Sequence, residues 1–124
     1  SDLGIMMSKA TSEAVDPPRV FLDSMVPLLT NVDSSKVVEF LQDRSARLKG
    51  VKGVFIFTVG VETIEPNLLS RLEEFVDCVI ELNINLSHGK TIRGLRIKKM
   101  RGRNASDNWI LFDINAANGI VFLV

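Results

Sequence analysis

The feature of this sequence that most constrains its fold is a threefold alternation between helical patterns and short apolar runs. Apolar residues recur at helical spacing over residues 3–14, 37–48 and 68–75, and an apolar run follows each of these segments. Continuously apolar strands that alternate with helices are typical of a parallel sheet covered by helices on both faces, with right-handed crossovers. The sequence therefore predicts an α/β fold with strands at Arg19–Leu22, Val51–Val59 and Val76–Ile84.

Residue types that favour the ends of helices support these boundaries. Asp2 suits the start of the first helix, and Asp33 or Ser34 can cap the second through a side-chain oxygen. Gly50 is expected to end the second helix, and Pro66 to begin the third. A loop is expected around Thr30 to Val32, before the second helix.

The C-terminal third of the chain alternates strand patterns with turns and has no helical pattern. Asn118 and Gly119 can adopt positive φ in a hairpin turn between the last two strands. We therefore expect an antiparallel β-meander on the edge of the parallel sheet. Its parts are a turn at Ser87–Lys90, a basic strand at Thr91–Arg101, a polar loop at 103–108, and strands at Trp109–Ile114 and Gly119–Val124.

Composition limits the class of protein. The chain has 124 residues, no net formal charge and one cysteine, which predicts a single domain over residues 1–124 without disulfides or structural metal, as in a reducing cytoplasm. No apolar run approaches the roughly 20 residues that a membrane helix requires, so no membrane insertion is expected. The zero net charge also argues against a general nucleic-acid coat.

An acidic residue and a hydroxyl follow two neighbouring strands of the predicted sheet. Asp23 follows the first strand and Thr58 lies at the end of the second, the edge where open α/β sheets bind ligands. An aspartate at this place can hold Mg²⁺, and the threonine can orient water or a phosphate oxygen. The alternatives are that Asp23 only caps a turn and that Thr58 is only a β-branched strand residue.

Basic residues are concentrated in the C-terminal third. Between His88 and Ser106 there is no acid, and the stretch holds 7 of the 15 basic residues. An anionic partner is therefore a candidate ligand of this stretch. The seven are Lys90, Arg93, Arg96, Lys98, Lys99, Arg101 and Arg103.

Two of these cations are predicted to share one face of the basic strand. Lys99 and Arg101 are about 6.6 Å apart at a rise of roughly 3.3 Å per residue, which suits two oxygens of a polyphosphate. Leu95 and Ile97 are expected to precede them on that face, and Gly102 would let the backbone approach a ligand closely. The alternative is a solvated edge strand that its charges protect against aggregation.

Three other reactive or aromatic residues are expected to have structural roles. His88 fits an exposed turn residue, Cys78 a small buried hydrophobe, and Trp109 a packed aromatic residue. The only histidine has no plausible nucleophile partner, so no Ser-His-Asp or Cys-His site can be built.

Four segments taken together resemble the KaiC-like branch of the RecA superfamily of ATPases. The most specific is Lys-Met-Arg-Gly followed by a final Gly-Ile strand, and the likeness spans nearly the whole chain. The segments are Arg19–Ser24, Val54–Thr58, Leu95–Gly102 and Asn118–Phe122.

This resemblance implies roles for the candidate residues. Asp23 would be the Walker B aspartate near Mg²⁺, with Ser24 beside it, and Thr58 would lie at the sensor strand. Lys99 and Arg101 would reach the phosphates of ATP held by the adjacent subunit of a homo-oligomeric ring or filament.

The sequence also departs from the family pattern. It contains no G-x-x-x-x-G-K-[ST], so it has no P-loop and resembles only a C-terminal half. In RecA-like sheets the P-loop strand lies between the second and third strands found here, which would leave a gap. We expect the gap to be filled by the missing N-terminal half, by closure of the two strands, or by another chain.

Three functions follow for comparison. The first is a nucleotide-binding module that uses ATP and Mg²⁺ and does not hydrolyse ATP alone. The second is a regulatory or oligomerisation domain without catalysis. The third is a recombinase-like module that binds single-stranded DNA, which the zero net charge and the few exposed-looking aromatic residues disfavour.

Overall fold

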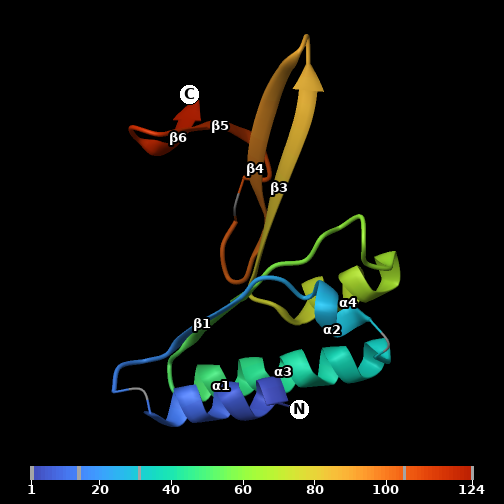
Figure 1. The fold of residues 1–124 in the computed structure, drawn as a ribbon, viewed down its shortest axis with the longest axis vertical. Coiled ribbons are helices and arrows are strands. Elements are labelled where there is room, and N and C mark those ends of the chain that lie inside the picture. Colours follow the sequence, from blue (N-terminus) through green and yellow to red (C-terminus); the bar gives the residue numbers. More distant parts are fainter. Residues whose placement is uncertain (1, 14, 31, 105, 124) are drawn as a thin grey trace. The chain divides into compact units, whose positions relative to one another are not determined.

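The computed structural model describes residues 2–13, 15–30, 32–104 and 106–123 (Figure 1). The chain divides into two compact units, residues 1–75 and 76–124, and each is described by itself. The mixed α/β class agrees with the sequence. Ala14 and Val124, predicted to belong to the first helix and the last strand, lie outside the described residues. The elements are α1 (Asp2–Glu13), β1 (Arg19–Leu22), α2 (Val26–Leu29), α3 (Ser34–Gly50), β2 (Val54–Phe57), α4 (Pro66–Phe75), β3 (Cys78–Ser87), β4 (Lys90–Met100), β5 (Ile110–Asn115) and β6 (Gly119–Leu123).

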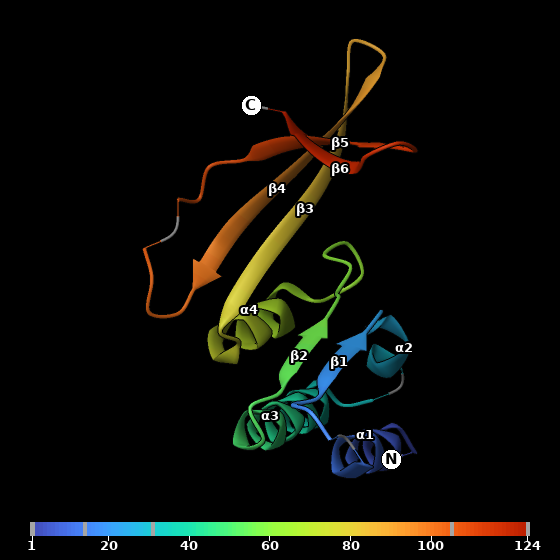
Figure 2. The same cartoon turned by 90° about the vertical axis from the view of Figure 1, so that its left-hand side faces the viewer.

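The first unit contains a two-stranded parallel sheet, β1 beside β2 (Figure 2). The register pairs Arg19 with Val54 and Leu22 with Phe57, so the two strands end level with each other. This in-register pairing confirms the predicted parallel arrangement of the first two strands. It also brings the residues that follow the two strands to the same edge of the sheet.

The long helix α3 has the predicted ends. The Asp33 carboxylate caps it by accepting a hydrogen bond from the Ser35 amide at 3.2 Å. At the other end, the amide of Gly53 donates to the Leu48 carbonyl at 2.7 Å, and Lys52 adopts a φ of 59°. Residues 51–53 therefore close the helix, which is why β2 begins at Val54 and not at Val51 as predicted; it also ends at Phe57, two residues before the predicted end.

The core of the first unit lies on one face of the β1–β2 sheet. Leu22, Phe55 and Phe57 pack against it, but Phe21 is 64% exposed and Val54 and Ile56 are each 50% exposed. Side chains alternate between the faces of a strand, so only every second one reaches the helices. The prediction that helices cover both faces is wrong for the described residues. The buried cluster comprises Met25, Val37, Val38, Leu41, Ile64, Leu68 and Leu72.

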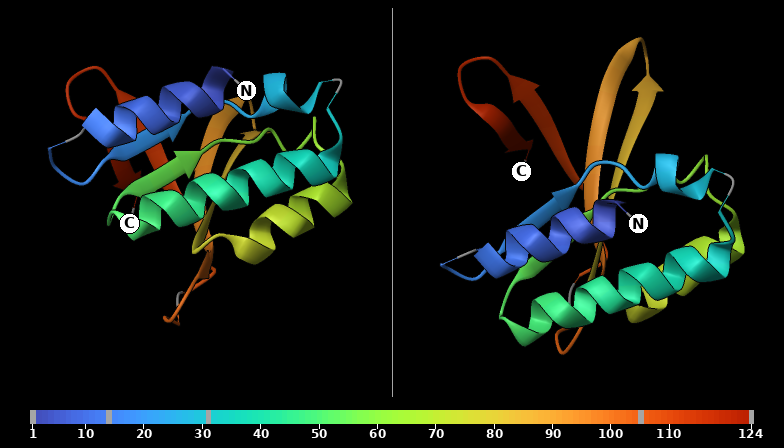
Figure 3. Two further views of the ribbon diagram at one scale, coloured as in Figure 1. Left: turned by 90° about the horizontal axis from the view of Figure 1, so that it is seen from below. Right: turned by 60° about the horizontal axis from the view of Figure 1, so that its bottom comes forward.

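One arginine joins α1 to α3, which Figure 3 shows side by side. Arg44 Nη1 donates to the Ser8 hydroxyl at 2.6 Å and to the Gly4 carbonyl at 3.3 Å. Its guanidinium also lies over the Phe40 ring and pairs with Asp43 at 3.0 Å.

Within the described residues, no helix is long and apolar enough to cross a membrane.

The second unit is a four-stranded antiparallel sheet in the order β3-β4-β5-β6. This is the predicted meander with one more strand, because β3 was expected to continue the parallel sheet. It pairs with β4 instead, through a two-residue turn at His88 (φ 52°) and Gly89 (φ 74°). Positive φ at both positions matches the twist of an antiparallel hairpin, so this local connection determines the partner of β3.

The last hairpin turns where the sequence predicts it, but Asn118 does not adopt the positive φ that was expected of it. Gly119 adopts a φ of 68°, and the Asn118 amide donates to the Asn115 side chain at 2.7 Å. The strands β2 and β3 belong to different sheets, one in each unit.

Candidate functional site

The carboxyl ends of β1 and β2 bring Asp23 and Thr58 into contact. The Thr58 hydroxyl Oγ1 donates to Asp23 Oδ1 at 2.7 Å, across 35 positions of sequence. Asp23 is exposed and Thr58 is partly buried. Within the described residues the second carboxylate oxygen, Oδ2, accepts no hydrogen bond. The pair therefore presents one bound and one open oxygen at the predicted edge.

The backbone around this pair is held from both sides by Thr58. Its amide donates to the Leu22 carbonyl at 3.1 Å, and its carbonyl accepts from the Met25 amide at 2.9 Å. The Met25 side chain is fully buried in the core. The dipeptide Asp23–Ser24, whose peptide bond is cis, lies between these two anchored residues.

Ser24 lies beside the pair, two residues before the short helix α2, which the sequence analysis did not identify. Its hydroxyl accepts a hydrogen bond from the Val26 amide at 3.2 Å. A four-residue helix carries too little periodicity to be recognised. The only signal for α2 in the sequence is its place between Ser24 and the capped start of α3, and that place indicates no more than a turn.

The donor set at this edge suits a hard cation such as Mg²⁺. It consists of the Asp23 carboxylate and the hydroxyls of Ser24 and Thr58, all oxygens. Among the described residues, no three His, Cys, Asp or Glu side chains gather as a metal site. A metal ion here would therefore complete its shell with water and substrate oxygens, as Mg²⁺ commonly does.

The basic strand β4 departs from regular pairing before its end. Ile97 pairs with Ile80, but the next pair joins Lys99 to Val79, so Lys98 is an extra residue in a β-bulge. Cross-strand partners share a face, and neighbours on β3 alternate between faces. Lys99 therefore lies on the opposite face from Ile97 and Leu95, which corrects the prediction that these side chains share a face.

Arg101 and Gly102 follow the strand. The Arg101 amide donates to the Asp77 carbonyl at 2.8 Å, and its Nε lies 3.4 Å from Asp77 Oδ1. Arg101 lies two positions after Lys99, beyond Met100, the last paired residue of β4. Gly102 has a φ of 75° and no atom within 4 Å of the position a Cβ would take, so the turn after the pair is open.

An acid that the sequence analysis did not single out pairs with two neighbouring cations. Arg96 Nε lies 2.7 Å from Glu81 Oε2, and Lys98 Nζ lies 3.4 Å from Oε1. The hydrogen bond from Arg96 is the main cause of the lowered pKa of Glu81, which Lys98 also lowers and which burial opposes. Much of the positive charge of this stretch is thus balanced within the sheet.

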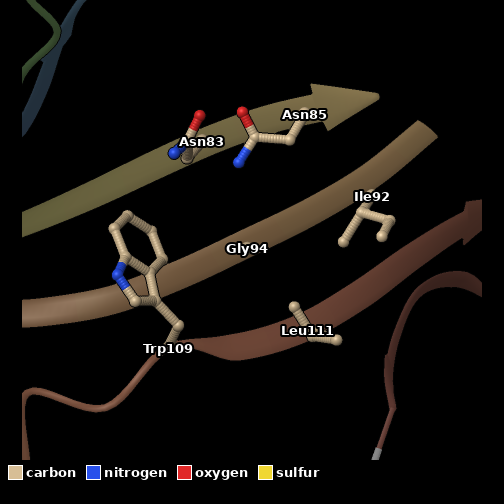
Figure 4. A pocket seen from close by; sticks show the side chains of 6 residues that line it. All are labelled: Asn83, Asn85, Ile92, Gly94, Trp109 and Leu111. Atoms are coloured by element: carbon tan, nitrogen blue, oxygen red, sulfur yellow. The ribbon is translucent and has the colours of Figure 1, made fainter. Parts of the chain in front are cut away.

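Trp109 lies against the same strand, and Figure 4 shows it at a shallow hollow of about 120 Å³. Its ring covers Gly94, and the Arg96 guanidinium lies 4.9 Å from the ring centre. Trp109 therefore packs on the strand as expected, but its ring is 41% exposed and is not part of the core. The hollow is lined by Asn83, Asn85, Ile92, Gly94, Trp109 and Leu111.

The structure confirms the prediction for His88 and contradicts the one for Cys78. His88 is an exposed turn residue, as predicted, with Nδ1 3.1 Å from the Ser87 hydroxyl. Cys78 is exposed, so the prediction of a buried hydrophobe is wrong. It begins β3 on the same face as Ile80, which is 57% exposed, and no helix of the second unit covers that face.

Comparison with known proteins identifies the family. A KaiC ATPase family model matches residues 3–124, whereas no curated protein matches significantly. A solved KaiC-like protein from the hyperthermophilic archaeon Pyrococcus horikoshii is similar in fold, with a TM-score of 0.66 and 23% identity over 86% of this chain. The matched region is 46% of that protein, so the chain spans less than half of its length. The chain belongs to the KaiC ATPase family.

Proposed function

We propose that this chain is the Walker B portion of a KaiC-like ATP-binding domain, and that Asp23 is its Walker B aspartate. The observation that carries the proposal is the contact between Thr58 and Asp23 at the carboxyl ends of two parallel strands. That edge is where open α/β sheets bind ligands. Family membership supports nucleotide binding as the function of the lineage.

Magnesium fits the oxygens at this edge. Asp23 would hold the ion through a bound water, and its open Oδ2 is the atom available for that contact. Ser24, next in sequence, would take part through its hydroxyl. The ion would neutralise charge on the ATP phosphates, which is its usual contribution to phosphoryl transfer.

The basic residues after β4 are proposed to act on a nucleotide held by another subunit. Lys99 and Arg101 are two positions apart at the end of β4, and the open turn at Gly102 gives the backbone room beside a phosphate. The other half of the same fold would provide the P-loop that this sequence lacks, and a homo-oligomer of the completed fold would place Lys99 and Arg101 beside the nucleotide of a neighbouring subunit. Alone, the chain is therefore expected to bind ATP without hydrolysing it.

The test is the solution mass of the chain by light scattering, with and without Mg-ATP. We expect Mg-ATP to promote assembly and Asp23→Asn to abolish the effect. Asp16→Asn makes the same charge change at an exposed site before β1 and serves as the matched control. A mass indifferent to Mg-ATP, together with no Mg²⁺-dependent ATP binding by calorimetry, would overturn the proposal.

The second candidate is a regulatory or oligomerisation domain without catalysis. The observation in its favour is that, within the described residues, acids in or next to the sheet already pair with four of its cations, Arg93, Arg96, Lys98 and Arg101. This function predicts a dimer or larger assembly that forms equally with and without nucleotide. Binding of single-stranded DNA, the third candidate, predicts salt-sensitive affinity that Lys99→Ala and Arg101→Ala both weaken.

A further inference from the structure

Thr58 makes three hydrogen bonds that enclose a single dipeptide. Its amide and carbonyl bind the residues on either side of Asp23–Ser24, and its hydroxyl binds the Asp23 side chain. The two backbone bonds are available to any residue except proline at this position. Only the third bond depends on the identity of the side chain, so the hydroxyl is the part of Thr58 that acts on Asp23.

The direction of that bond limits what else the hydroxyl can do. A threonine hydroxyl has one hydrogen to donate, and here Asp23 Oδ1 receives it at 2.7 Å. Toward any other group it then presents only acceptor lone pairs. A phosphate oxygen is also an acceptor, so Thr58 in this state cannot donate to one. The geometry disfavours the earlier interpretation that Thr58 binds a phosphate directly.

We propose that Thr58 is a positioning residue, whose hydroxyl fixes the rotamer of Asp23 so that Oδ2 stays directed to the metal. The inference rests on the proposed function, because it assigns the Mg²⁺ contact to Asp23. Outer partners that orient a ligating side chain typically change metal affinity by 10–100-fold when they are removed. Thr58→Val keeps the shape and both backbone bonds, and it removes only the hydroxyl.

The experiment compares the whole chain as wild type, Thr58→Val and Thr58→Ser by NMR. Couplings of the Asp23 side chain report its χ1 rotamer without any ligand. Titration with Mn²⁺ alone, at millimolar concentrations, reports metal binding through broadening of nearby amide signals. Thr63→Val is the matched control. The Thr63 hydroxyl also donates one hydrogen bond, 2.9 Å long, but its acceptor is the Gly60 carbonyl and not Asp23.

We expect one Asp23 rotamer in the wild type, averaging in Thr58→Val, and recovery in Thr58→Ser. The Mn²⁺ concentration for half-maximal broadening should rise about tenfold in Thr58→Val and return close to the wild-type value in Thr58→Ser. An unchanged Asp23 rotamer in Thr58→Val would overturn the positioning role, and so would an unchanged Mn²⁺ affinity in Thr58→Val if Asp23→Asn weakens that affinity.

A separate variant tests the function on which this inference rests. If Asp23→Asn broadens with Mn²⁺ as the wild type does, or the wild type does not bind Mn²⁺ at all, the metal role of Asp23 is wrong. The rotamer measurement does not depend on metal, so it still decides whether Thr58 positions Asp23. The two failures are therefore distinguishable.

Discussion

The two candidate regions of the molecule were built by different kinds of strand pairing. The contact between Asp23 and Thr58 joins two loops that follow parallel strands, and the whole helix α3 lies between them in sequence. The basic residues Lys99 and Arg101 lie at the end of a hairpin strand whose partner is its immediate neighbour. The first contact depends on where strands end, whereas the second region depends on which face each residue takes.

This difference determines how sensitive each region is to a local irregularity. Two parallel strands of equal length end side by side when their register has no shift. The register of β1 and β2 has none from Arg19 to Leu22. A face on an antiparallel strand is reversed by a single inserted residue, which is the effect of the bulge at Lys98. Pairing with Asp77 then fixes the direction of Arg101.

The largest expected effect comes from breaking the parallel register. Gly53 precedes β2, and a Cβ there would lie 2.7 Å from the Pro18 carbonyl oxygen, which also accepts from the Val54 amide. The Pro18 carbonyl belongs to the backbone and cannot move aside without disturbing the strand pairing, so Gly53→Ala should lower the free energy of unfolding by about 1–3 kcal/mol. Thermal unfolding followed by helical circular dichroism measures the loss. Gly50→Ala, at a site with open space, is the matched control, and an equal loss there would refute the steric explanation.

The sequence predicts that Asp23 and Thr58 lie at the same edge of the sheet, because each step of that prediction uses a strong local signal, but it does not predict the hydrogen bond between them. Apolar runs locate the strands, Asp33 locates the next helix, and parallel pairing follows from the helix between the strands. The roles of these residues toward ATP and Mg²⁺ remain proposals, because residue types at an edge do not identify a ligand.

Other features could not be predicted for equally specific reasons. The bulge at Lys98 cannot be recognised in the sequence, because the pattern of apolar and basic residues around it looks like that of a regular strand. Phe21 is exposed because no helix covers its face of the sheet. The residue types of a strand do not indicate which of its faces will be covered. Glu81 is one acid in an apolar strand, and its two cationic partners become evident only once β3 and β4 are in register.

A smaller effect is expected when the same substitution is made in the second unit. In Gly94→Ala the added Cβ would lie 3.0 Å from Trp109 Cε3, which belongs to a partly exposed side chain and not to backbone. The ring can tilt, so the loss of stability should be below about 1 kcal/mol. Tilting exposes the indole, and emission from Trp109, the only tryptophan, should shift to longer wavelength. An unchanged spectrum with a loss as large as that of Gly53→Ala would contradict this.

The smallest effect is electrostatic and has a defined pH range. The pKa of Glu81 in the folded chain lies below its ordinary value of 4.5, chiefly because Arg96 donates a hydrogen bond to it. A carboxyl with a lowered pKa stabilises the fold above the unfolded value, and that stability is lost as the pH falls through the folded value. Glu81 is partly exposed, so the contribution should be only about 0.5–1 kcal/mol. Unfolding monitored by Trp109 fluorescence should therefore show Glu81→Gln less stable than wild type at pH 7, with the difference shrinking below pH 4.5. Asp107→Asn, in the polar loop of the same unit, is the charge-matched control, and a difference that does not depend on pH would mean that Glu81 contributes by packing alone.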